Sequence, residues 1–293
     1  MNRRPLAMKI EIPFARRCPL GLCQSDDDWD TPRMERYIKA VEREVVANAD
    51  QFDDCSIESI RLGGGCASLA PAASVADLTR TIRQLYHVRD EAPITMTASI
   101  ADISGATMPF FRRAGITRFD FMMMSLDTFD FARLNTRDNL RDFPLICECF
   151  LHAYANDTLG LVLAYGLEGN AVVFRRSLIT ALRNHCQHIE LQRWMGQGAA
   201  CDESHEAEDQ LDEARDILAQ EGFVEYAPLH FARPGHEDRC IAAEASDRDI
   251  IAFGLGAQTR MDGAKSTNTS DIELYLAHSD DFSLITADIE AVQ

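Results

Sequence analysis

Strand-like and helix-like segments alternate along the chain up to about residue 200, and this order constrains the fold more than any other feature of the sequence. Short apolar segments typical of strands occur at residues 8–14, 57–62, 94–98, 118–124, 159–165 and 188–194. Segments with apolar side chains at helical spacing lie between them, at residues 31–45, 75–85, 108–114, 143–155 and 172–184. Strands that alternate with helices predict a parallel sheet with crossover connections.

The number of strand-helix units favours a partial barrel over a closed one. About six strand-helix units fit before residue 200, which is fewer than the eight of a complete (β/α) barrel. We therefore predict an α/β fold with an open, partial (β/α)6 barrel over residues 1–200 and a small accessory segment over residues 201–293. The accessory segment is expected to include an acidic helix at residues 204–221 and a glycine-rich loop at residues 254–257.

The first helix has a recognisable start. Thr31 is predicted to cap it, with Pro32 in the first turn and apolar residues at helical spacing from Met34 to Val45.

Charge and cysteine content exclude several classes of partner. The chain has 47 Asp and Glu residues against 29 Lys and Arg residues, a formal charge of −18, so nucleic acid and anionic lipid are poor partners. No apolar run has the length of a membrane span or of a signal peptide core. The nine cysteines are an odd number and are scattered, which is typical of free thiols in a reducing compartment. We therefore expect a cytoplasmic protein.

The candidate site lies where the parallel strands end, because ligands of such folds bind at the carboxyl ends of the strands. Gly63, Gly64 and Gly65 follow the second predicted strand directly. Without side chains, their backbone N–H and C=O groups are open to the charged ends of a ligand. The alternative interpretation is a tight turn between strand and helix.

Three cysteines form the candidate metal site. Cys18 and Cys23 lie in the loop after the first strand, and Cys66 follows the glycines at the end of the neighbouring strand. Thiolates hold zinc and iron–sulfur clusters, so the three could share one cavity. The alternative is that all three are ordinary thiols.

Other chemistry-bearing residues have simpler interpretations. We expect at least one of Met122, Met123 and Met124 in the core. The scattered histidines lack the short pairing of a helical zinc site and are treated as surface or structural residues; they are His185, His188, His205, His230 and His236. No Ser–His–Asp arrangement or phosphate-binding loop can be made out, so no catalytic residue is assigned.

Several motifs occur in an order that resembles the oxygen-independent coproporphyrinogen III oxidase family of radical SAM proteins, which includes related haem chaperones. The resemblance runs from about residue 8 to residue 263. The motifs are Ile10-Glu11-Ile12-Pro13-Phe14 with Cys18-Pro19, Leu62-Gly63-Gly64-Gly65-Cys66-Ala67-Ser68-Leu69, Ala114-Gly115-Ile116-Thr117-Arg118, Tyr165-Gly166-Leu167-Glu168-Gly169, Phe231-Ala232-Arg233-Pro234-Gly235-His236-Glu237, Gly254-Leu255-Gly256-Ala257 and Asp262-Gly263.

The resemblance implies a [4Fe–4S] cluster held by three cysteines, with S-adenosylmethionine (SAM) on the open iron. Ala15 stands at the place of the first of these cysteines, and Cys18 and Cys23 are spaced differently from the family's remaining pair. Cys66 or an external thiol would replace the missing ligand. The positions that would contact SAM hold Thr97, Met124 and Val162. The haem-associated pattern of the chaperones would fall at residues 240–245, where the sequence differs from it.

The resemblance thus implies a tetrapyrrole- or haem-related protein, and the changed positions predict that its [4Fe–4S] and SAM chemistry is impaired or absent. If active, the chain would be a radical SAM oxidoreductase. Gly63, Gly64, Gly65 and Cys66 are the predicted cofactor-binding residues, and Cys18, Cys23 and Cys66 the predicted metal ligands. The alternative is a catalytically inert barrel that serves as a ligand-binding or regulatory module. Porphyrin, haem or a protein is then the expected partner.

Overall fold

Six parallel strands that follow one another in the chain form the centre of the fold. The computed structural model describes residues 3–15, 29–128, 130, 142–154, 158–167, 169–194 and 205–291. The six strands neighbour one another in chain order, and each pair is parallel. This confirms the predicted parallel sheet. The strands are β1 (Arg4–Glu11), β2 (Cys55–Gly63), β3 (Ile94–Ala98), β4 (Arg118–Met124), β5 (Thr158–Tyr165) and β6 (His188–Arg193).

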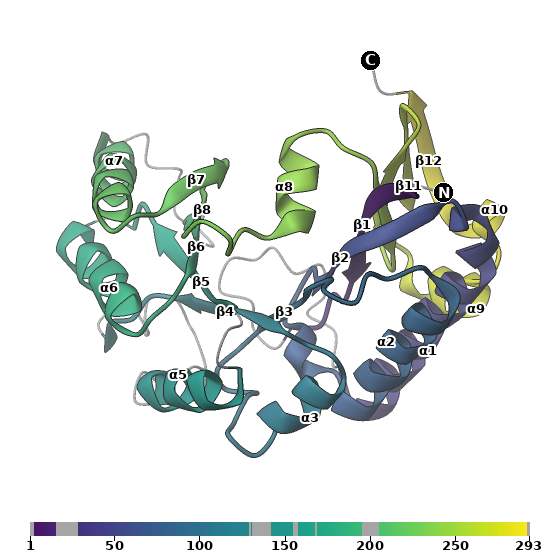
Figure 1. Cartoon of the computed structure of the whole chain (residues 1–293), viewed down its shortest axis with the longest axis horizontal. Coiled ribbons are helices and arrows are strands. Elements are labelled where there is room, and N and C mark those ends of the chain that lie inside the picture. The colour runs from purple at the N-terminus through teal and green to yellow at the C-terminus, as the bar shows by residue number, and fades with distance from the viewer. Residues whose placement is uncertain are drawn as a thin grey trace.

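Helices cover one face of this curved sheet, as Figure 1 shows. Every residue of β3 and of β5 is buried, because helices lie outside these strands and side chains fill the inner side. In the described ranges, no helix combines the length and the apolar character that crossing a membrane requires. The outer helices are α1 (Thr31–Asn48), α2 (Ala72–Leu85), α3 (Met108–Arg113), α5 (Asp142–Ala153) and α6 (Ala171–Arg183).

The first helix begins with a different cap from the one that its sequence suggested. Asp30 is the N-cap: its backbone is extended and its side chain accepts a hydrogen bond from the Arg33 N–H at 2.8 Å. Thr31 is already helical, so the prediction of a Thr31 cap was wrong by one residue. The Asp30 carboxylate reaches the free N–H groups of the first turn, which is what a cap residue must do.

The first strand also lies earlier in the chain than residues 8–14. Arg4 pairs with Cys55 and Leu6 with Ile57, so the register with β2 begins well before the apolar run. The strand ends at Glu11, ahead of Pro13. A proline has no N–H to give to a ladder, which explains why the strand does not continue through the motif.

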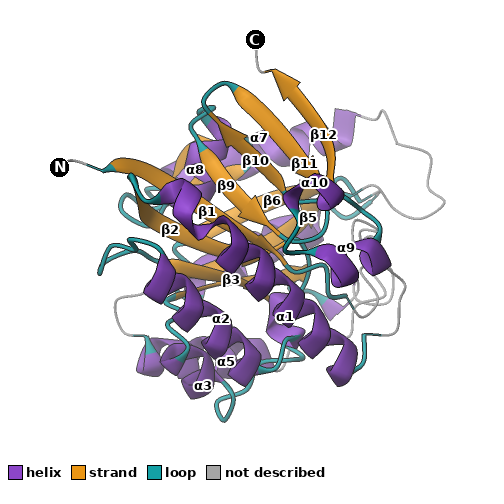
Figure 2. Cartoon of the chain, turned by 90° about the vertical axis from the view of Figure 1, so that its right-hand side faces the viewer, coloured by secondary structure: helices purple, strands orange, loops and turns teal. Residues whose placement is uncertain are grey.

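The strands after residue 200 extend the same sheet at both edges. β9 (Ile250–Phe253) pairs in parallel with β1, and three antiparallel pairings add β10 (Gln258–Met261), β11 (Ala264–Asn268) and β12 (Thr286–Ala291) beyond it. Figure 2 looks onto α1 and shows these strands next to β1. At the other edge β8 (His230–Ala232) and β7 (Val224–Ala227) follow β6. The sheet is therefore mixed and, in the described residues, has twelve strands, and the division at residue 200 stays a prediction.

The remaining helices belong to this second part of the chain. The acidic helix predicted at residues 204–221 is present as α7 (His205–Gln220). The short helix α8 (Arg239–Ala245) packs against β1 and β2. Near the carboxyl end lie α9 (Ile272–His278) and α10 (Phe282–Ile285), and α9 contacts α1.

Candidate functional site

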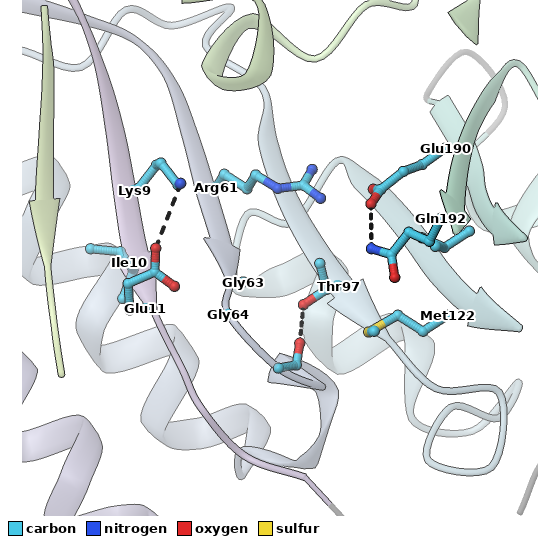
Figure 3. Close-up of a pocket in the computed structure, with 12 residues that line it drawn as sticks. Lys9, Ile10, Glu11, Arg61, Gly63, Gly64, Thr97, Met122, Glu190 and Gln192 are labelled. Carbon is cyan, nitrogen blue, oxygen red and sulfur yellow. Dashed lines mark hydrogen bonds and ion pairs between the residues drawn. The ribbon is translucent and has the colours of Figure 1, made fainter. Parts of the chain in front are cut away.

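A pocket of about 250 Å³ lies toward the carboxyl ends of the parallel strands, where the sequence placed the candidate site. Residues from all six parallel strands line it, and Figure 3 shows them converging from the two sides of the barrel. Its volume is near the lower end of small-molecule sites, which span roughly 300–1,000 Å³. The lining residues are Lys9, Ile10, Glu11, Arg61, Gly63, Gly64, Gly65, Thr97, Met122, Val162, Glu190 and Gln192.

The three predicted glycines line the pocket, but they differ in what surrounds them. A Cβ on Gly65 would meet the Phe14 carbonyl oxygen at 2.5 Å and the Ile12 carbonyl oxygen at 2.9 Å. Gly64 has a φ of +84°, and a Cβ there would meet the Glu11 carboxylate. A Cβ on Gly63 would make only ordinary contacts with side chains, with Thr97 Cγ2 at 3.6 Å and with Arg61 Nε at 3.7 Å. Gly64 and Gly65 are thus required by the close approach of the chain's own first strand and the segment after it.

The positions that the resemblance assigns to SAM hold one hydrogen-bonding side chain, Thr97, and two apolar ones, Met124 and Val162. The Thr97 hydroxyl donates to the carbonyl oxygens of Gly65 and, at 3.4 Å, Leu62. Val162 and Met122 give the pocket an apolar wall. Met124 is buried and packs with Val162 in a small apolar cluster. Met123 is also buried, which confirms the expected core role for at least one methionine of this run.

Charged side chains stand on both sides of the pocket. Lys9 Nζ lies 3.6 Å from Glu11 and 3.1 Å from Glu244. Although burial opposes it, the charges of Glu11 and Glu244 raise the pKa of Lys9. On the other side, burial raises the pKa of Glu190, but the His230 imidazole 3.6 Å away lowers it overall. Both pocket walls therefore hold charged groups near neutral pH.

Beneath the pocket lies a buried ionic network that sequence reasoning missed. Arg61 Nη1 donates to Asp120 at 2.6 Å and to Asp238 at 2.8 Å. Burial opposes the charge on Asp120, but Arg118, His188 and Arg61 hold the pKa of this carboxyl well below its usual range. A charged residue between two apolar neighbours in a strand was the available signal, at Arg61 in β2, Asp120 in β4 and Glu190 in β6. Their partners lie on other strands and in the segment before α8, so the sequence alone did not reveal the pairing.

The histidines of this region are structural, as expected. His188 is completely buried, and its Nε2 lies 2.9 Å from the Tyr226 hydroxyl. His236 Nδ1 lies 2.9 Å from the Thr158 hydroxyl.

The predicted metal site is described only at Cys66. Cys18 and Cys23 lie outside the described residues. The Cys66 N–H donates to the Phe14 carbonyl oxygen at 2.7 Å, so Cys66 stands beside the residues that lead into the loop with the other two thiols. In the part of the chain that the structure describes, no three His, Cys, Asp or Glu side chains are grouped so that they could hold a metal ion.

The region that would match the haem-associated pattern forms α8. Cys240 in this helix is buried, and its Sγ lies 3.2 Å from Ser59 Oγ of β2. Burial raises the pKa of the Cys240 thiol to about 12, so the thiol stays protonated and packs between helix and sheet.

Comparison with known proteins identifies the class of fold. No family model matches the chain. The structure of coproporphyrinogen III oxidase (HemN) from Escherichia coli, described as a radical SAM enzyme, superposes with a TM-score of 0.86 and 18% identity, covering 99% of this chain and 73% of that one. The chain therefore has the partial barrel of the radical SAM proteins.

Relatives found by sequence show which family within this class the chain is related to. A haem chaperone HemW from Synechocystis sp. is 24% identical over 287 residues, which cover 89% of this chain and 67% of that protein. Oxygen-independent coproporphyrinogen III oxidase from Salmonella typhimurium is 20% identical over 303 residues, 95% of this chain and 66% of the relative. The chain is a distant homologue of the HemN/HemW family of radical SAM proteins. It spans about two thirds of the length of these relatives.

Proposed function

We propose that this chain is a tetrapyrrole- or haem-related member of its family in which [4Fe–4S] and SAM chemistry is impaired or absent. The observation that carries the proposal is the pocket wall at the positions assigned to SAM. Thr97 directs its hydroxyl at the chain's own carbonyl groups, and Val162 offers only an apolar surface.

These walls would bind a polar cofactor poorly. SAM carries ammonium, carboxylate and sulfonium groups, and each buried polar group that finds no partner costs about 1–3 kcal/mol. Met124, at the third position, lies in the apolar cluster with Val162 and does not line the pocket. The changes at Thr97 and Val162 therefore act together on one pocket.

The cluster ligands support the same proposal. Ala15 stands at the place of the first cysteine, and its side chain supplies no ligand. We propose that Cys18, Cys23 and Cys66 form whatever metal site exists. The position of Cys66 beside Phe14 favours it as the third ligand. We further propose that residues 1–200 act as the barrel unit and residues 201–293 as the accessory segment.

Anaerobic reconstitution with iron and sulfide tests the proposal. We expect fewer than four irons per chain and a visible spectrum that SAM does not change. The triple variant Cys18→Ser, Cys23→Ser, Cys66→Ser should lose whatever iron is bound, whereas Cys149→Ser, at a half-buried thiol of α5, should not. A stoichiometric four-iron cluster whose spectrum responds to SAM would overturn the proposal.

The alternative function is that of an inert barrel that binds a ligand. The charged and hydrogen-bonding groups of the pocket favour it, because they line the pocket beside the apolar Val162. Titration of the iron-free protein with haem, followed by the haem absorption band, tests this directly. Saturable binding of one haem per chain would support a haem-binding role without radical chemistry, and the absence of a spectral change would exclude it.

A further inference from the structure

The pocket contains a pair of side chains on β6 that neither the motifs nor the proposed function uses. Gln192 Nε2 donates a hydrogen bond to Glu190 Oε1 at 2.6 Å, and both side chains line the pocket. Figure 3 shows the Gln192 amide nitrogen turned toward Glu190 and the amide oxygen turned away from it, on the side of Met122. That oxygen is buried, and within the described ranges it has no hydrogen-bond partner.

The charge on Glu190 fixes this orientation of the amide. His230 Nε2 lies 3.6 Å from Glu190 Oε2. Against the effect of burial, this contact keeps the pKa of Glu190 low, so the side chain is an ionised carboxylate at neutral pH. An ionised carboxylate only accepts hydrogen bonds, so the NH₂ group of Gln192 must face it. The Gln192 oxygen is thereby held as a buried acceptor on the side of Met122, which also lines the pocket.

A buried acceptor without a donor is unfavourable, and a ligand that brings an N–H group relieves that cost. The charge around the pocket favours a ligand that is also a cation. Counting the lining side chains, their charged partners and Arg118, which pairs with Asp120, five carboxylates face four basic groups even when His230 is protonated. Burial lowers the pKa of His188, which lies 3.3 Å from Asp120, so this imidazole is counted as neutral. The carboxylates are Glu11, Glu190, Glu244, Asp120 and Asp238, and the basic groups are Lys9, Arg61, Arg118 and His230.

The basic groups already have partners among these carboxylates. Arg61 is shared between Asp120 and Asp238, and Lys9 between Glu11 and Glu244. Next to Gln192, Met122 lines the pocket, as Figure 3 shows, and with Val162 it supplies an apolar surface for the carbon skeleton of a ligand.

We propose that Glu190 and Gln192 are the recognition pair for a small ammonium ligand whose apolar body lies against Met122 and Val162. The ammonium group donates to Gln192 Oε1 and lies next to the Glu190 carboxylate. The inference rests on the proposed function in treating this pocket as a ligand site, but it does not depend on whether an iron–sulfur cluster forms.

Calorimetric titration of the full chain with three matched probes tests the inference. 2-Phenylethylammonium carries the ammonium group, 2-phenylethanol replaces it with a neutral hydroxyl, and 3-phenylpropanoate replaces it with a carboxylate. Because a hydrogen bond to a charged group contributes more than a neutral one, we expect the ammonium to bind about tenfold or more tightly than the alcohol. The carboxylate should not bind, since Glu190 repels it.

Two variants test whether Glu190 and Gln192 cause the preference for the ammonium probe. Gln192→Met keeps the size of the side chain but removes the amide, and Glu190→Gln removes the charge. Each should weaken ammonium binding roughly ten- to hundredfold while changing binding of the alcohol little. The control Gln220→Met, at an exposed residue at the end of α7, should change neither.

Iron content is measured on the same samples, so failure of the proposed function shows as a complete cluster and failure of this inference shows in the titrations. The inference is overturned if the alcohol binds as tightly as the ammonium. It is equally overturned if folded Gln192→Met retains the ammonium preference, a test that stands even where Glu190→Gln does not fold.

Discussion

Replacing Gly65 with alanine tests whether the glycine triplet is needed for packing of the chain on itself. The new Cβ would lie 2.5 Å from the Phe14 carbonyl oxygen, 2.9 Å from the Ile12 carbonyl oxygen and 3.0 Å from the Phe14 nitrogen. These are all backbone atoms, so no side chain can rotate away to make room. The segment after β1 would have to move outward, and the hydrogen bond from the Cys66 N–H to Phe14 would stretch with it.

The cost follows from these contacts. Overpacking of a close-packed interior costs typically 1–3 kcal/mol, and weakening one buried hydrogen bond adds about 1 kcal/mol. We therefore expect Gly65→Ala to lower the free energy of unfolding by about 3 kcal/mol. For a chain of this size that corresponds to a fall in Tm of roughly 6 °C.

Gly63→Ala is the matched control within the same triplet. Its Cβ would make only ordinary contacts, with Thr97 Cγ2 at 3.6 Å and the Arg61 side chain at 3.7 Å. Its stability should stay within about 1 kcal/mol of the parent, because alanine also restricts the unfolded chain. Thermal denaturation followed by circular dichroism compares the two variants. Equal stability of Gly65→Ala and Gly63→Ala would refute the packing explanation.

Two further predictions concern α1. Asp30→Ala should destabilise the protein by about 1 kcal/mol through loss of the cap, and Thr31→Ala by clearly less; denaturant titration showing the reverse order would restore Thr31 as the cap. Burial raises the pKa of Glu44 to about 7 from 4.5. The folded state therefore holds this proton more tightly than the unfolded state does. The free energy of unfolding should fall as pH rises from about 4.5 to 7, by up to about 3 kcal/mol. Unfolding measured across this window should show a flatter profile for Glu44→Gln, and parallel profiles would contradict the assignment.

The amino-acid sequence by itself determined the order and type of the central elements. The bounds of β3 and β4 agree with the predicted strands at residues 94–98 and 118–124. These strands could be predicted because they are buried on both faces, so apolar residues predominate in them even though Thr95, Thr97 and Asp120 interrupt the run. The helix α2 was likewise visible from its spacing, since one face packs on the sheet. The glycines at the strand end marked the right place for the pocket.

Only the tertiary structure decided what the pocket contains. Arg61 meets Asp120 from β4 and Asp238 from the segment before α8, partners 59 and 177 residues away in the chain. β9 joins β1 across an even longer separation. No local pattern encodes such pairings, because a charge inside a strand looks the same in sequence whether its partner is near or absent. The orientation of Gln192 likewise depends on Glu190 and His230 being brought together by two strands, β6 and β8.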